Sequence, residues 1–139
     1  MERRHFLQSI ALASSSSLII SSCSNAKKPV ENLNYSNGHI IHVVYFWLKE
    51  DLTDDDEKDF LKFFEILKTV PTVKSLQVCK PAPTNPRDVV DNSFSYNILV
   101  GFDSMKDINV YETHAIHTDA AAKYSKYWTK VQVRDSVVV

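Results

Sequence analysis

Residues 111–117, with the sequence YETHAIH, place one phenol and two imidazoles close together in a chain that has five histidines. An imidazole titrates near neutral pH and can take a proton from carbon or oxygen. A phenol can donate a hydrogen bond to an oxygen that gains negative charge during a reaction. With His117 as base and Tyr111 as donor, the stretch would suit enolisation, isomerisation or aldol closure of a carbonyl compound.

The same side chains also have structural interpretations, which the sequence leaves open. His117 could cap a helix or hydrogen-bond a backbone carbonyl. Tyr111 could be an amphipathic residue of the core. For His114, a structural or surface role is the favoured interpretation. His114 and His117 lie three residues apart, a spacing that can bring two imidazoles to one metal ion on a helix. No further ligand cluster accompanies them in the sequence, so neither a metal site nor a cofactor is predicted.

The composition excludes several classes of function. The net charge is −1 and the lysines are scattered among acidic residues, so a nucleic-acid surface is not expected. Gly38 and Gly101 are the two glycines of the chain, too few for a glycine-rich phosphate loop. The apolar share of 44% and the charged share of 24% are ordinary for a globular domain.

Residues 1–22 have the layout of a bacterial export signal. Arg3 and Arg4 precede a modestly apolar run, a pattern that resembles a twin-arginine signal. The run is shorter than the ~20 apolar residues that span a bilayer. The residues that end at Cys23 resemble a lipobox, in which the cysteine thiol carries lipid and tethers the protein to a membrane. Residues 23–37 are polar and aperiodic and are interpreted as a flexible tether, which predicts an exported, membrane-attached lipoprotein.

The remaining residues, 38–139, are predicted to form one α+β domain. Period-two alternation predicts four strands, and helical spacing predicts three helices between them. The strands are expected at 39–49, 73–80, 93–103 and 131–139, and the helices at 53–68, from Ser104, and from Thr118 or Asp119. The order β-α-β-β-α-β is the ferredoxin-like unit, a four-stranded antiparallel sheet with its helices on one face.

The first predicted strand is apolar on both faces. His42, Val44 and Phe46 share the face expected beneath the helices, so His42 could line one pocket with His117 and Tyr111. Val43 and Tyr45 belong to the opposite face, which helices of the same chain would leave bare. A bare apolar face favours a closed homodimer in which two sheets pack together.

Two stretches of the domain carry a resemblance to a known family. HVVYFWLK at 42–49 and YETHAIH at 111–117 resemble motifs of the stress-responsive A/B barrel, or Dabb, family, with Ala115 where the family usually has proline. The resemblance implies a dimeric α/β barrel. One plant member is a cyclase that uses aldol chemistry without metal or cofactor, whereas related dimeric barrels bind haem.

The resemblance also implies roles for individual residues. The cyclase pattern falls on His42, Tyr111 and His117 as candidate catalytic residues, and Tyr96 stands near a further pocket histidine of that relative. Tyr96 is therefore predicted to line the pocket, and His114 of the YETHAIH motif is a further pocket-lining candidate. The predicted function is binding of a small carbonyl or aromatic compound, at most with cofactor-free lyase, cyclase or isomerase activity. The alternative is a non-catalytic, stress-related binding or structural dimeric module.

Overall fold

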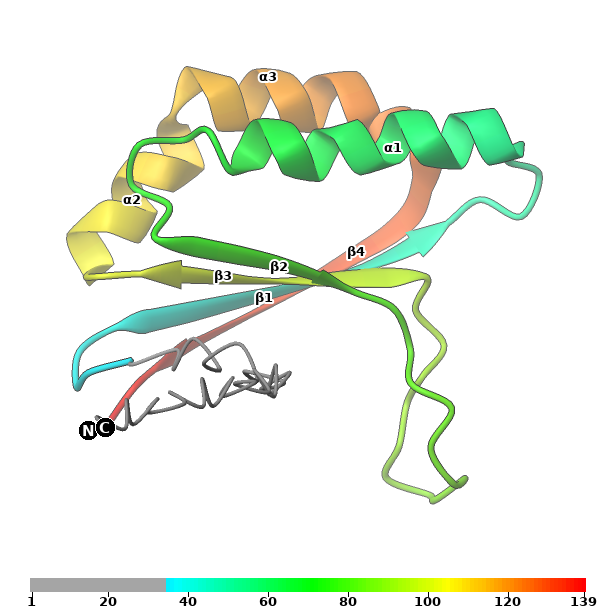
Figure 1. Cartoon of the computed structure of the whole chain (residues 1–139), viewed down its shortest axis with the longest axis horizontal. Coiled ribbons are helices and arrows are strands. Elements are labelled where there is room, and N and C mark those ends of the chain that lie inside the picture. The colour runs from blue at the N-terminus through cyan, green and yellow to red at the C-terminus, as the bar shows by residue number, and fades with distance from the viewer. Residues whose placement is uncertain (1–34) are drawn as a thin grey trace, which may run out of the picture. The chain divides into compact units, whose positions relative to one another are not determined.

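The computed structural model describes residues 35–139, which fold into a four-stranded sheet with helices on one face (Figure 1). The strand order is β2-β3-β1-β4, and every neighbouring pair is antiparallel. In chain order the elements are β1 (Ile40–Leu48), α1 (Asp54–Leu67), β2 (Ser75–Cys79), β3 (Tyr96–Phe102), α2 (Met105–Thr113), α3 (Ala115–Tyr124), the 3-10 helix η1 (Ser125–Tyr127) and β4 (Trp128–Val137). The predicted ferredoxin-like α+β fold is confirmed. The predicted export signal, Cys23 and most of the predicted tether lie outside the described residues.

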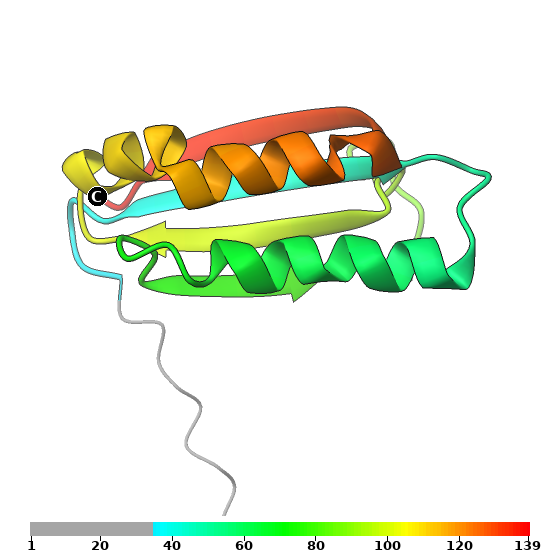
Figure 2. The ribbon, with the colours of Figure 1, turned by 90° about the horizontal axis from the view of Figure 1, so that it is seen from above.

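Helix α1 begins where its sequence signals predict. The Thr53 side chain accepts a hydrogen bond from the Asp56 backbone N–H, and the Asp56 carboxylate accepts one from the Thr53 backbone N–H. Acidic residues fill the first turn, where the positive end of the helix dipole stabilises them. The apolar face of α1 then lies against the sheet, beside α3 (Figure 2).

The two elements near the end of the chain begin earlier than the sequence predicts. Helix α3 begins at Ala115 instead of Thr118 or Asp119, because His114 supplies the cap: its Nδ1 accepts the Ile116 backbone N–H at 3.2 Å. Strand β4 begins at Trp128, three residues before the predicted start, because its pairing with β1 continues past a register shift beside Leu48. Both differences come from hydrogen-bond partners that periodicity does not reveal.

The core between the sheet and the helices is rich in aromatic side chains. The Phe46 ring lies 5.7 Å from that of Phe60, 5.5 Å from that of Phe64 and 5.3 Å from that of Trp128, measured between centroids. Phe60 and Phe64 are fully buried. Burial of each such ring stabilises the fold by about 2–3 kcal/mol relative to leaving it exposed. These rings fill the part of the core between β1 and α1.

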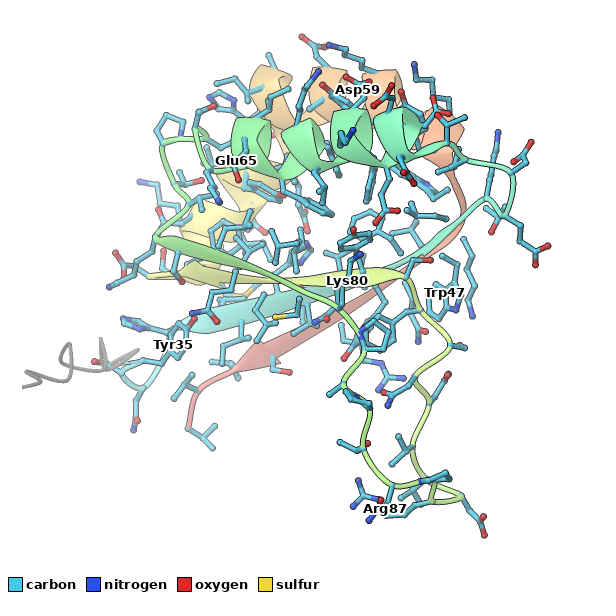
Figure 3. All side chains as sticks on the ribbon, turned by 45° about the vertical axis from the view of Figure 1, so that its right-hand side comes forward. Tyr35, Trp47, Asp59, Glu65, Lys80 and Arg87 are labelled. Carbon is cyan, nitrogen blue, oxygen red and sulfur yellow. The ribbon has the colours of Figure 1, made fainter. Side chains whose placement is uncertain are left out.

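The opposite sheet face is partly covered by the segment between β2 and β3. This segment projects away from the helices, with Arg87 far from the sheet (Figure 3). Near the sheet, the Trp47 indole N–H donates to the Ser93 hydroxyl at 2.9 Å, and the Tyr45 and Phe94 rings lie 5.0 Å apart. Aliphatic side chains on this face, such as that of Val43, remain only half-buried.

The described chain begins in contact with the sheet. The Tyr35 hydroxyl lies 3.2 Å from the Ser75 hydroxyl, and the Tyr35 ring covers Gly101, where an added Cβ would lie 2.8 Å from the ring. Tyr35 belongs to the predicted tether, yet it packs on the domain. Within residues 35–139, no helix is both long enough and apolar enough to cross a membrane.

Candidate active site

A cavity of about 420 Å³ opens between the helix-facing side of the sheet and the helices. Its volume falls in the range of small-molecule sites, and most of its lining is apolar. The lining residues are His42, Val44, Phe46, Phe63, Leu67, Ile98, Tyr111, Glu112, His117, Ala121, Trp128, Val131 and Val133. Val131 and Val133 are 46% and 47% exposed, so the cavity is open along β4. It is therefore an apolar chamber with a small group of polar side chains in its wall.

His42 enters this wall from β1 and is held by a carboxylate. It lies opposite Asp135 of β4 in the strand register, and its Nδ1 is 2.6 Å from Asp135 Oδ1. A carboxylate accepts, so Nδ1 carries the proton and donates, which leaves Nε2 with a free lone pair when the ring is neutral. His42 is buried, whereas Asp135 is half-exposed. The carboxylate thus fixes both the tautomer and the orientation of the imidazole.

Tyr111 enters from α2 and is almost fully buried. Its ring centroid lies 5.1 Å from that of Phe102 and 5.8 Å from that of His42. Burial raises the pKa of the Tyr111 phenol well above its usual value, so the hydroxyl stays protonated at neutral pH. Among residues 35–139 no side chain or backbone group hydrogen-bonds this hydroxyl, which leaves its proton available to a ligand oxygen.

His117 lies in the first turn of α3, at the break between α2 and α3. Its Nδ1 lies 3.2 Å from the backbone carbonyl oxygen of Glu112, and because a carbonyl only accepts, Nδ1 donates. The His117 and Tyr111 ring centroids are 4.4 Å apart. Burial lowers the pKa of His117 below its usual value near 6.5, so the neutral imidazole dominates at neutral pH. Its Nε2 can then accept a proton.

Three elements therefore bring together a neutral imidazole, a protonated phenol and a second imidazole. The base and the donor each hold at neutral pH the protonation state that proton transfer requires. The apolar side chains of the lining strengthen electrostatic interactions beside them relative to those in bulk water. The arrangement can remove a proton from a bound molecule and stabilise the resulting oxyanion.

The structure places the two other predicted pocket residues, His114 and Tyr96, outside this cavity. His114 is the cap of α3, and its ring nitrogen is engaged with the Ile116 backbone N–H. Tyr96 pairs with Phe46 in the β1–β3 register, four residues along β3 from Val100, the partner of His42. The aromatic core separates it from the histidines, and its hydroxyl donates to Glu57 in a different hollow of about 290 Å³. Neither residue is among those that line this cavity, and Tyr96 lines the other hollow instead.

A family model places the fold and this site in a known context. The Stress Responsive A/B Barrel Domain, Dabb, matches residues 40–138, which include every strand and helix of the described domain. The chain belongs to the Dabb family. A search of curated proteins found no match.

Solved structures similar to this Dabb domain share its fold at low sequence identity. A Dabb family protein with a ferredoxin-like fold from Mesorhizobium loti is 21% identical, with a TM-score of 0.61, and the match covers 73% of this chain and 98% of that one. A dimeric ferredoxin-like protein of unknown function from Bacteroides fragilis is 19% identical, with a TM-score of 0.58 and coverage of 75% and 100%. A hydroxynitrile lyase from Passiflora edulis is 16% identical, with a TM-score of 0.63 and coverage of 75% and 95%. These likenesses establish the fold.

Asp135 is a residue of the Dabb site that sequence reasoning did not single out. The signal was present, because Asp135 interrupts a strand face that is otherwise valine: Val131, Val133, Val137 and Val139. A carboxylate on an otherwise apolar strand face needs a hydrogen-bond partner, and the buried His42 is that partner. Within the described part of the chain, no three His, Cys, Asp or Glu side chains gather as metal ligands would.

Proposed function

We propose that this Dabb domain binds a small carbonyl compound with an apolar or aromatic body and transfers a proton on it. The observation that carries the proposal is the meeting of His117, Tyr111 and His42 in one largely apolar cavity. A flat or alkyl body would lie against Phe63, Trp128 and the neighbouring aliphatic side chains. The carbonyl oxygen would face the Tyr111 hydroxyl.

The proposed reaction begins at a carbon next to the carbonyl group. His117 Nε2 takes a proton from that carbon, the C–H electron pair moves into an enolate, and the Tyr111 hydroxyl donates a hydrogen bond to the enolate oxygen. Return of the proton from the imidazolium to the same or another carbon completes an exchange or an isomerisation. Attack of the enolate on a second carbonyl would give an aldol closure.

His42 would serve as the second proton carrier of the site. Asp135 holds its Nδ1–H, so its Nε2 can accept a proton, and the carboxylate would stabilise the imidazolium that forms. Asp135 is half-exposed, so the carboxylate that contacts this imidazole also contacts solvent. One imidazole could therefore remove a proton while the other returns one to a different atom.

Deuterium exchange at the methyl group of acetophenone in D2O, followed by proton NMR, tests the proposal. The wild-type protein is expected to accelerate exchange, and His117→Ala and Tyr111→Phe are expected to lose most of that acceleration. His39→Ala is the matched control, because His39 contacts Asp103 outside the cavity. Binding of ketones by the wild type with no exchange would refute catalysis and favour a non-catalytic binding module instead.

We also propose that the domain is a homodimer through the sheet face opposite the helices. Relatives from Bacteroides fragilis and Thermobifida fusca are dimeric proteins of this fold. Half-buried apolar side chains such as Val43 occupy that face here, and a second copy would remove them from water. Analytical ultracentrifugation of residues 35–139 at micromolar concentration is expected to give a dimer, and a monomer would contradict the proposal.

Residues 1–23 support a further proposal, on location. A twin-arginine-like start followed by a lipobox-like end at Cys23 favours an exported protein held at a membrane of the cell envelope by lipid. Fractionation of cells that express the full chain is expected to recover it with membranes. The Cys23→Ala variant should appear in the soluble fraction, and its retention on membranes would contradict lipid anchoring.

A further inference from the structure

The polar end of the cavity is acidic and lacks a cationic side chain. Among the described residues that line the cavity, Glu112 is a carboxylate and none is lysine or arginine. His117 does not supply a positive charge at neutral pH, because burial favours its neutral form. Asp135 stands behind His42 and adds a second carboxylate, although His42 hydrogen-bonds it. A negatively charged ligand would meet no lysine or arginine among these lining residues.

Glu112 is the unpaired carboxylate of the two. Within residues 35–139, no lysine, arginine or histidine forms an ion pair with its side chain. The backbone carbonyl of Glu112 accepts a hydrogen bond from His117 Nδ1–H. This bond fixes the Glu112 backbone, from which the side chain extends, near the His117 ring. Glu112 also lines a second hollow of about 260 Å³, so it stands where the two spaces adjoin.

The helix ends at the site do not reverse this negative potential. Helix α2 ends at Thr113 and α3 begins at Ala115, so a negative helix end and a positive helix end meet on either side of His114 (Figure 1). Each end is equivalent to roughly half a charge, and adjacent ends of opposite sign largely cancel. The His114 ring already occupies one N–H of the α3 terminus. The full charge of Glu112 therefore outweighs what remains of the charges of the two helix ends.

We infer that Glu112 is a specificity-determining residue, which makes the cavity select uncharged carbonyl compounds and reject those that carry a carboxylate or phosphate. This inference rests on the proposed function and names the substrate class of the same site. The unfavourable interaction is modest, because Glu112 is exposed and the high dielectric constant of the surrounding water weakens the effect of its charge. The penalty for an anion is therefore expected to be about tenfold in affinity, well below the value for a buried charge pair.

A pair of ketones that differ in charge and hardly in shape tests the inference. In 4-acetylbenzamide and 4-acetylbenzoate, the same aryl ketone carries a neutral amide or a carboxylate. Isothermal titration at pH 7 and low ionic strength would give both dissociation constants for the full-length protein. The wild type is expected to bind the amide about tenfold more tightly. Glu112→Gln should reduce this ratio to about threefold or less, and Glu112→Lys should favour the benzoate.

Glu50→Gln is the matched control, because it removes the same charge from an exposed position outside the cavity. The ratio of its dissociation constants for the two ketones should equal that of the wild type. This comparison separates a local effect of Glu112 from an effect of net charge. If both ketones bind and the ratio is the same in all four proteins, the inference is overturned while the proposed carbonyl site stands. If neither ketone binds the wild type, the proposed function fails and the inference fails with it.

Discussion

His42 and Asp135 face each other across neighbouring antiparallel strands, and 2.6 Å separates Nδ1 of the imidazole from Oδ1 of the carboxylate. The pair is formed by residues 93 positions apart in the chain. Because strand pairing sets their Cα positions and the hydrogen bond sets the ring orientation, His42 is rigidly presented to the cavity. Its contribution to chemistry should therefore depend on a residue that lies outside the cavity lining.

Asp135→Asn tests this dependence. The amide can still accept from Nδ1 through its oxygen, but it no longer provides a charge that stabilises the imidazolium. The rate of ketone deuterium exchange is expected to fall about ten- to a hundredfold, the usual effect of removing an orienting partner. Nitrogen-15 NMR should show a larger share of the Nε2–H tautomer of His42. Asp119→Asn, on the exposed side of α3, should change neither quantity.

Tyr111→Phe should separate the chemistry of Tyr111 from its packing. The ring remains against Phe102 and His117, and the hydroxyl has no partner among the described residues, so the free energy of unfolding should change by less than about 1 kcal/mol. Loss of the donor should lower the exchange rate by about 10²–10³-fold. Tyr111→Ala, in contrast, should cost about 3–5 kcal/mol in urea denaturation because it leaves a cavity. An exchange rate unaffected by Tyr111→Phe would remove the phenol from the mechanism.

The sequence was sufficient to predict the fold and to place His42, Tyr111 and His117 on the same side of the sheet, and the reason is periodicity. Alternation along β1 puts His42 beneath the helices, and the spacing from Tyr111 to His117 puts both at the break between α2 and α3. Tyr96 shows the limit. It lies on the correct sheet face, but its distance along β3 from the histidines depends on the β1–β3 register, which periodicity does not determine. Asp135 was missed for the same reason, because its partner lies on another strand.

The pH dependence of exchange should report the environment of His117. Its neutral form is the base, and burial lowers its pKa, so the rate should be level at neutral pH and fall only as the pH drops below the usual histidine value near 6.5. Proton NMR of the imidazole resonances would give the titration directly. A fall in rate centred above that value would contradict the assignment of His117 as the base.

The lowered pKa of His117 also predicts that the stability of the fold depends on pH. In the unfolded chain His117 takes up a proton near pH 6.5, whereas in the folded protein it does so only at lower pH. The unfolded state therefore binds more protons in that interval, and the free energy of unfolding should decrease as the pH falls through it. His117→Asn cannot titrate, so its denaturation midpoint should decline less over the same interval. Equal declines in the two proteins would contradict a lowered pKa.

Val43→Lys should disrupt the proposed dimer without unfolding the domain. Val43 lies on the sheet face opposite the helices, between Leu99 of β3 and Arg134 of β4, and is half-buried in the single chain. A lysine there can extend to water in the monomer, whereas in a packed pair of sheets its charge would be buried near its symmetry mate. Sedimentation should therefore shift to the monomer, with an unchanged circular dichroism spectrum. Val110→Lys is the control, because Val110 is 41% exposed on α2, and it should remain dimeric. A Val43→Lys variant that stays dimeric would place the interface on another surface.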